Sequence, residues 1–159
     1  MAKARRSQNN SNDTIDSLIA RLATLESVVS VSYHVSANFA ATASIPINYD
    51  TKIYDPNNYV TTSPTAWKFT APVAGKYLIV GSGGASNGLF ALVFKNGSAF
   101  MNIGAVSQSA GQNSPIQGVI SLNAGDFIDI RPNGSSTVIG GALNATNGVT
   151  NIQITRIGN

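Results

Sequence analysis

The chain has 159 residues, enough for one domain with a sizeable core, and 43% of them are apolar. Only 11% are charged and no cysteine is present, which excludes disulfide frameworks and thiolate metal sites. The formal charge is +3, and Lys3, Arg5 and Arg6 account for it because the other seven basic residues match the seven acidic ones.

Residues 1–11 are polar and basic, and we expect them to form a disordered arm. Three charges without aromatic neighbours are a weak signal for nucleic acid, so nucleic-acid binding is not expected. The arm either contacts other proteins of a larger assembly or remains solvated without a partner. A polar run follows the basic start, so no secretion signal is expected, and no apolar stretch reaches the ~20 residues that span a membrane.

Residues 12–31 are predicted to form a helical stalk, because apolar residues recur there at spacings of three and four. The predicted seam of a trimeric coiled coil is Ile15, Leu18, Leu22, Leu25 and Val29. Two to three heptads are too few for a helix that is stable alone, so the stalk requires partner helices. The alternative is an ordinary amphipathic helix that packs on its own domain. The seam does not settle the number of helices.

The rest of the chain, residues 32–159, is predicted to be an all-β head. Short β-like runs alternate there with Gly, Asn and Pro, and no helical pattern interrupts them. The predicted strands are Tyr33–Ala40, Ile45–Ile47, Trp67–Thr70, Lys76–Ser82, Leu89–Lys95, Ser98–Ile103, Ile116–Leu122, Phe127–Arg131, Ile152–Ile157 and, less regularly, Thr137–Leu143. This pattern predicts an antiparallel β-sandwich.

The run "GLFALVF", residues 88–94, is apolar on both faces of a strand, although a sandwich strand normally wets one face. We expect one set of alternate residues to fill the sandwich: Phe90, Leu92 and Phe94. The other set would then meet a neighbouring subunit or a loop of the same chain: Leu89, Ala91 and Val93.

The segment "WKFTAPVAGKYLIV", residues 67–80, joins two β-like runs through a corner that contains Pro72 and Gly75. With Phe69, Thr70 and Tyr77 it resembles the signature of complement-one-q-like globular heads, a branch of the tumour-necrosis-factor-like jelly rolls. "LVFKNGS" and "GVISLNAGDFIDI" follow in the order of that family. The resemblance implies an antiparallel jelly-roll head that forms homotrimers, as in bacteriophage fibre or spike proteins, with Phe69 and Tyr77 in the core or an interface.

No catalytic residue, metal site or cofactor is predicted, and we expect a protein that is not an enzyme. His34 is the only histidine, and no Ser or Cys stands at a spacing that makes a triad credible. Asp50 and Asp55 carry the oxygen ligands that calcium prefers, but without a recognisable ligand spacing.

Two loops rich in Tyr, Asn, Gln, Ser and Gly are suited to recognition, and ordinary loops without a partner are the alternative. The candidate ligand-facing residues are Tyr54, Asn57, Asn58, Tyr59, Gln108 and Gln112.

The prediction for function is therefore a non-enzymatic virion structural protein. It would be a homotrimeric head fibre, spike or tail-fibre knob that decorates a phage particle and binds a host surface glycan or receptor. Other virion proteins would hold it through the arm. The alternative is a trimeric lectin-like module on a bacterial surface or in the extracellular medium.

Overall fold

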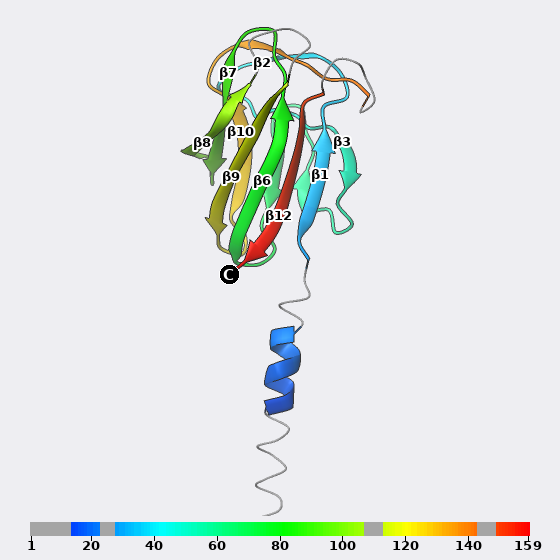
Figure 1. The fold of residues 1–159 in the computed structure, drawn as a ribbon, viewed down its shortest axis with the longest axis vertical. Coiled ribbons are helices and arrows are strands. Elements are labelled where there is room, and N and C mark those ends of the chain that lie inside the picture. Colours follow the sequence, from blue (N-terminus) through cyan, green and yellow to red (C-terminus); the bar gives the residue numbers. More distant parts are fainter. Residues whose placement is uncertain (1–13, 23–27, 107–112, 143–148) are drawn as a thin grey trace, which may run out of the picture.

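A computed structural model of the chain describes residues 14–22, 28–106, 113–142 and 149–159 (Figure 1). In these ranges a helix over residues 14–22 precedes twelve β-strands. The strands are β1 Ser30–His34, β2 Phe39–Ala41, β3 Thr51–Tyr54, β4 Val60–Thr61, β5 Lys68–Thr70, β6 Gly75–Gly83, β7 Leu89–Lys95, β8 Ser98–Val106, β9 Ser114–Leu122, β10 Phe127–Pro132, β11 Ser136–Val138 and β12 Asn151–Gly158. The predicted all-β antiparallel architecture is confirmed.

The strands form a two-layer sandwich (Figure 1). One five-stranded sheet, here called the β6 sheet, has the order β3-β1-β12-β6-β9, and the other, the β10 sheet, has the order β4-β5-β10-β7-β8. A small β11-β2 sheet lies at one end. All the pairings are antiparallel, so each layer is built from strands that run up and down the same axis.

The two ends of the head are defined by β1. We call the end where β1 begins, at Ser30, the proximal end, because the helix precedes it in the chain. Strand pairing places the start of β6 and the end of β12 there as well. The distal end is where β1 stops, at His34, and the β11-β2 sheet lies at this end (Figure 1).

The core lies between the two sheets and follows from alternation, because successive side chains of a strand point to opposite faces. In the β6 sheet Val31, Ile154 and Ile79 are paired neighbours, and all three are fully buried. Burial of each such side chain contributes about 1.5–3 kcal/mol. The largest buried ring is Trp67, whose centroid is 5.0 Å from that of Tyr49.

One edge of the sandwich closes through a glycine. A β-carbon on Gly118 of β9 would lie 2.6 Å from Cγ2 of Ile103 and 3.1 Å from Cε of Met101, both in β8. Because the glycine has no side chain, β9 of one sheet packs closely against β8 of the other.

The corner at residues 71–74 connects β5 to β6, as the motif predicts. Gly75 has φ +155°, and a β-carbon there would collide with the carbonyl oxygen of Gly158, so a larger residue is strained at this point. Tyr77 is fully buried and its hydroxyl donates to the carbonyl of Val73 at 2.6 Å. Its ring lies 5.5 Å from that of Phe69, which is also fully buried, so both residues belong to the core.

Three predicted strands differ from the structure. The run Tyr33–Ala40 is divided between β1 and β2, because the chain leaves β12 after His34 and pairs next with β11. Residues 45–47 form no strand, since Pro46 has no N–H and only Ile47 bonds β10, to the carbonyl of Ile130 at 2.7 Å. The run predicted at 137–143 is the shorter β11.

The two faces of β7 are the reverse of the prediction. Leu89, Ala91 and Val93 are buried in the core, whereas Leu92 and Phe94 are half-buried on the outer face. The reason is the register with β10, in which Val93 stands opposite the buried Ile130. The side chain of Phe90 lies outside the described part of the structure. The outer ring of Phe94 is covered by the guanidinium of Arg131, 4.1 Å from its centroid.

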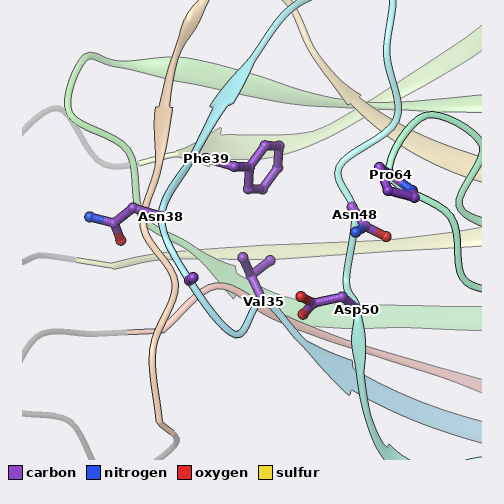
Figure 2. Close-up of a pocket in the computed structure, with 7 residues that line it drawn as sticks. Val35, Asn38, Phe39, Asn48, Asp50 and Pro64 are labelled. Atoms are coloured by element: carbon purple, nitrogen blue, oxygen red, sulfur yellow. The ribbon is translucent and has the colours of Figure 1, made fainter.

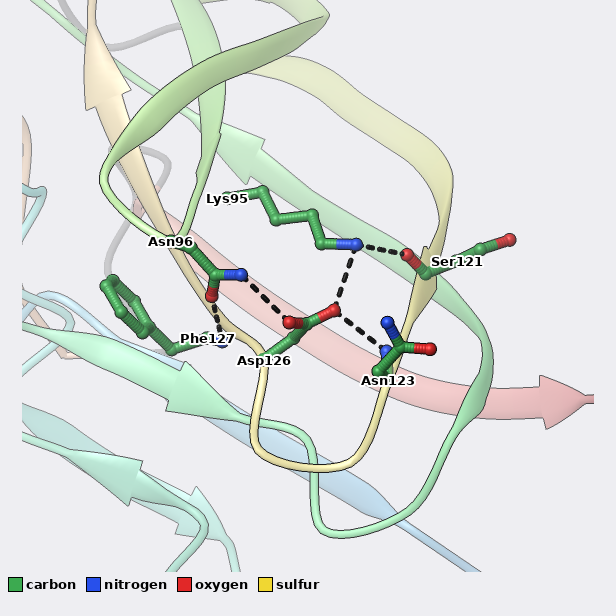
Figure 3. A network of polar contacts seen from close by, with 6 residues as sticks. All are labelled: Lys95, Asn96, Ser121, Asn123, Asp126 and Phe127. Atoms are coloured by element: carbon green, nitrogen blue, oxygen red, sulfur yellow. Dashed lines mark hydrogen bonds and ion pairs between the residues drawn. The ribbon is translucent and has the colours of Figure 1, made fainter.

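A polar network joins the turns at the proximal end (Figure 3). The carboxylate of Asp126 accepts hydrogen bonds from Asn96 Nδ2 and from the N–H of Asn123, both at 2.8 Å, and pairs with Lys95 at 2.9 Å. These contacts tie the β7–β8 turn to the β9–β10 turn. The hydrogen bonds from Asn96 and Asn123, followed by that from Lys95, lower the pKa of Asp126 from 3.8 to about 2.

This network predicts a dependence of stability on acid. The pKa of Asp126 is lower in the folded chain than in the unfolded one. The stability that the Asp126 carboxylate adds to the fold is therefore complete above pH ~4 and is lost as the pH falls toward 2. We expect Asp126→Asn to be less stable than the parent at pH 6, with a smaller difference at pH 2. Chemical denaturation of both proteins at both pH values measures the difference in stability. A difference that is the same at pH 6 and pH 2 contradicts the prediction.

Candidate functional site

The helix over residues 14–22 carries an apolar stripe that the head does not cover. Ile15, Leu18, Ile19 and Leu22 are each more than half exposed. In this structure the helix therefore does not pack on its own domain, which was the alternative to a coiled coil. Leu25, the next residue of the predicted seam, lies outside the described residues. A short helix with an uncovered stripe needs partner helices to be stable.

Val29 does not belong to the stalk, contrary to the prediction. It is 1% exposed and lies in the head core, and its carbonyl accepts a hydrogen bond from the N–H of Arg156 at 2.8 Å. β1 begins at Ser30, so the predicted end of the helix at residue 31 is also wrong. The sequence around Val29 is compatible with both a coiled-coil seam and a β-strand. The pairing of β1 with β12, which begins at Ser30, makes this segment part of the head.

The outer face of the β6 sheet is a second uncovered surface. Two rows of residues cross this face in register. The first row is Ser30, Thr155, Leu78 and Val119, and the second row is Ser32, Gln153, Val80 and Gln117. Neither row contains a charged residue, and Val119 is 49% exposed. These two rows lack the charged side chains that are depleted at the centre of protein interfaces, although the exposed Lys76 lies on the same face of β6 toward the proximal end.

The predicted recognition loop at residues 54–59 lies at the proximal end, because β3 runs antiparallel to β1. Tyr54 is the last residue of edge strand β3, stands opposite Ser32 and is 51% exposed. Asn57 and Asn58 are exposed, and Tyr59 is half-buried. Lys52 donates to the side chain of Asn58 at 2.8 Å.

The strand ends that flank the second predicted loop lie at the other end of the head from the first loop. Gln108 and Gln112 lie outside the described residues, but the strand ends on either side of them are described. Ser114 pairs with Gly83 at the distal end of β6, and Val106 with Leu89 at the distal end of β7. The chain therefore leaves and re-enters the described part at the end opposite to Asn57.

Asp55 holds the proximal loop in place, a role that the sequence did not indicate. It is 3% exposed, and its carboxylate accepts hydrogen bonds from the Tyr33 hydroxyl at 2.9 Å and from the N–H groups of Tyr59 and Val60 at 2.9 and 3.0 Å. Burial raises the pKa of Tyr33, and the bond to Asp55 raises it further. The carboxylate thus joins β1 to the start of β4.

Asp55→Ala should lower the free energy of unfolding by about 3 kcal/mol, because it leaves three donors without their charged acceptor. Urea denaturation measures the loss. Asn57→Ala, an exposed substitution in the same loop, should change stability by less than about 0.5 kcal/mol. Equal effects of the two substitutions would show that Asp55 does not organise this loop.

A hollow of about 190 Å³ lies at the distal end (Figure 2). Its lining comes from the segments that follow β1, precede β3 and follow β4: Val35, Ala37, Asn38, Phe39, Asn48, Asp50 and Pro64. Alternation places these side chains, since Ile47 and Tyr49 point into the core and leave Asn48 and Asp50 on the outer side.

The polar atoms of this hollow are unevenly satisfied. The Asp50 carboxylate accepts from the N–H and hydroxyl of Ser36 and from the Thr51 hydroxyl. Partial desolvation raises the pKa of Asp50, but these hydrogen bonds outweigh it and the pKa lies below its usual value. In contrast, Oδ1 of Asn48 is buried without a hydrogen-bond partner in the described part of the chain.

The described residues give no sign of a metal centre or a membrane helix. No group of three or more His, Asp or Glu side chains gathers among them. No helix within the described ranges is long and apolar enough to cross a membrane. His34 is 8% exposed, and its Nδ1 lies 3.3 Å from the carbonyl of Val35.

The comparisons with known proteins identify the fold. No protein-family model matches the sequence, and no curated protein matches it. Among solved structures, the Eiger TNF of S. frugiperda superposes with a TM-score of 0.59 at 12% identity, over 83% of this chain and 94% of that one. The globular domain of zebrafish complement 1qA gives 0.57 at 18% identity, over 82% and 98%. Murine APRIL gives 0.53 at 11% identity, over 81% and 100%.

The head therefore has the jelly-roll fold shared by tumour-necrosis-factor-like and complement-one-q-like domains, as its corner motif indicates. At these identities the likeness shows the fold alone. Function in such a fold depends on the surfaces that each chain adds to it.

Proposed function

We propose that this chain is a non-enzymatic structural protein that acts as a homotrimer. One observation carries the proposal: a single chain leaves two surfaces uncovered, the apolar stripe of the helix and the outer face of the β6 sheet, which mixes apolar and neutral polar side chains. Leu18 and Leu22 on the first, and Val119 on the second, each expose about half of their surface or more. Three parallel copies around one axis would cover both surfaces in one closed assembly.

We further propose that the trimer decorates a phage particle as a head fibre, spike or tail-fibre knob. Support comes from the low charge and the absence of cysteine, which suit a protein that packs into a crowded assembly. The basic arm, residues 1–11, would contact other virion proteins, and the head would project outward. In this arrangement the distal end faces the host surface, where a glycan or receptor is bound.

Mass spectrometry and immunogold labelling of purified particles test the virion assignment. The proposal expects this chain in every particle preparation, in copy numbers divisible by three. If the chain is absent from particles but present on a bacterial surface or in the medium as a trimer, the lectin-like module is the correct assignment.

A further inference from the structure

We propose that the distal hollow binds one residue of a neutral saccharide, with its hydroxyl groups on Asn48 and Asp50 and an apolar face of its ring against Phe39. This inference deepens the proposed attachment function and rests on it only for the biological source of the sugar. The hollow itself is a property of a single chain.

The size of the hollow limits the ligand. Sites for drug-sized molecules occupy roughly 300–1,000 Å³, and this one has about 190 Å³. It suits one small ring or the end of a chain of rings.

The lining combines apolar surface with a few hydrogen-bonding groups. Figure 2 shows Val35, Phe39, Asn48 and Asp50 facing a common space, with Pro64 behind the amide of Asn48. A sugar ring has the matching chemistry, because its C–H groups form apolar patches and its hydroxyls both donate and accept. The sugar hydroxyls would donate to the carboxylate of Asp50 and to the amide oxygen of Asn48.

The charge of the lining favours a neutral ligand. Asp50 is the one ionisable residue among those that line the hollow, so an anion is repelled there. A metal ion is also disfavoured, because the Asp50 oxygens already accept three hydrogen bonds. An aliphatic ligand would leave Asp50 and the amide of Asn48 desolvated without new partners, which costs binding energy.

The amide oxygen of Asn48 is one of four buried side-chain atoms that lack a hydrogen-bond partner within the described ranges, and Asn48 is the one residue of the four that lines the hollow. Buried polar atoms in native proteins nearly always have a partner, and an exception calls for a missing one. The terminal torsion of an Asn side chain is soft, so rotation about it can turn the amide oxygen toward a hydroxyl in the hollow. A bound sugar would supply the absent hydrogen bond.

The walls are held independently of any ligand. The N–H of Val35 donates to Thr150 at 2.9 Å, and its carbonyl accepts from Gly141 at 3.0 Å. Asn38 Oδ1 accepts from the N–H of Gly140 at 2.9 Å, and Phe39 packs against the core. A site that is formed in advance loses little conformational entropy when a ligand binds.

Saturation-transfer NMR on the purified full chain tests the proposal. The probes are the methyl glycosides of glucose, galactose, mannose, rhamnose and N-acetylglucosamine, with N-acetylneuraminic acid as the anionic comparison. We expect at least one neutral glycoside to bind with a dissociation constant on the order of 1 mM, the strength that about a dozen non-hydrogen atoms reach at ordinary efficiency. N-acetylneuraminic acid should bind more weakly than that glycoside.

Two variants locate the site. Asn48→Ala should raise the dissociation constant on the order of tenfold, because one hydrogen-bonding group is lost. Ala37→Trp fills the hollow from an exposed position and should abolish binding, and it keeps the test valid if Asn48→Ala does not fold. Asn57→Ala, the matched amide of the proximal loop, should leave the constant within about twofold.

The proposal is overturned if no neutral glycoside binds, if binding survives Ala37→Trp, or if Asn57→Ala abolishes it and Asn48→Ala does not. The oligomeric mass of the same samples is measured in parallel. A trimer that binds none of the probes would refute the saccharide site and leave the structural function standing.

Discussion

Leu22→Asp is expected to dissociate the trimer. Leu22 is the last described residue of the helix and exposes 53% of its side chain in a single chain. In a parallel three-helix seam the substitution buries three carboxylates in one layer. These carboxylates lose their hydration and have no positively charged partner there. We expect a loss of about 4 kcal/mol per trimer, or on the order of a thousandfold in the association constant.

Sedimentation equilibrium of the parent and two variants measures this effect. The matched control is Ala20→Asp, which places the same charge on the same helix but outside the predicted seam. The control should remain assembled at concentrations where Leu22→Asp is monomeric. If both variants keep the parent mass, the head alone sets the oligomeric state; if both dissociate, helix propensity rather than the seam explains the loss.

Gly81→Ala is expected to destabilise the head strongly. Gly81 stands opposite Ile152 in the pairing of β6 with β12, at the centre of the β6 sheet. A β-carbon there would collide with the backbone carbonyl of Asn151 and lie 3.1 Å from Cα of Ile152. Since backbone atoms cannot rotate away, β6 and β12 must separate at this point. We expect this to lower the free energy of unfolding by about 3 kcal/mol.

Gly158→Ala is the control for that prediction. Gly158 lies in the same pair of strands, but a β-carbon there meets nothing within 4 Å and its φ is outside the left-handed region. Gly158→Ala should change the free energy of unfolding by less than about 0.5 kcal/mol. Urea titrations at one fixed chain concentration compare the two, because the stability of an oligomer depends on concentration. Equal midpoints for Gly81→Ala and the parent would mean that this close approach does not exist.

The strands with strong local patterns could be predicted from the sequence, and the marginal ones could not. The run predicted at 89–95 is β7, and the runs at 76–82 and 127–131 match β6 and β10 to within one residue at each end. In contrast, β3 and β4 were not predicted, because each is short and lies at the edge of its sheet. Pairing with β1 and β5, rather than the residues themselves, makes them strands.

The orientation of β7 could not be decided from its own residues. Both alternate sets in 89–95 are apolar, so alternation alone permits either face to be inside. The register with β10 decides, and it turns Val93 inward and Phe94 outward beneath Arg131. Likewise, the boundary between stalk and head at Val29 depends on pairing with β12, which no local pattern contains.

Of the candidate surfaces, one could be predicted from the sequence and another could not. The stripe of the helix could be predicted because its spacing lies within one short segment. The distal hollow could not, since its walls come from three segments that only the fold brings together. The alternation of Ile47 and Tyr49 with Asn48 and Asp50 is the one local signal, and it places the polar residues outside without showing what they face.

The native mass of the full chain, measured by light scattering at micromolar concentration, tests the central claim most directly. The account predicts three chains of 16.5 kDa in one particle, about 50 kDa, with no detectable monomer. A folded, monodisperse monomer of 16.5 kDa would contradict it, because the helix stripe and the outer face of the β6 sheet would then have no need of partners.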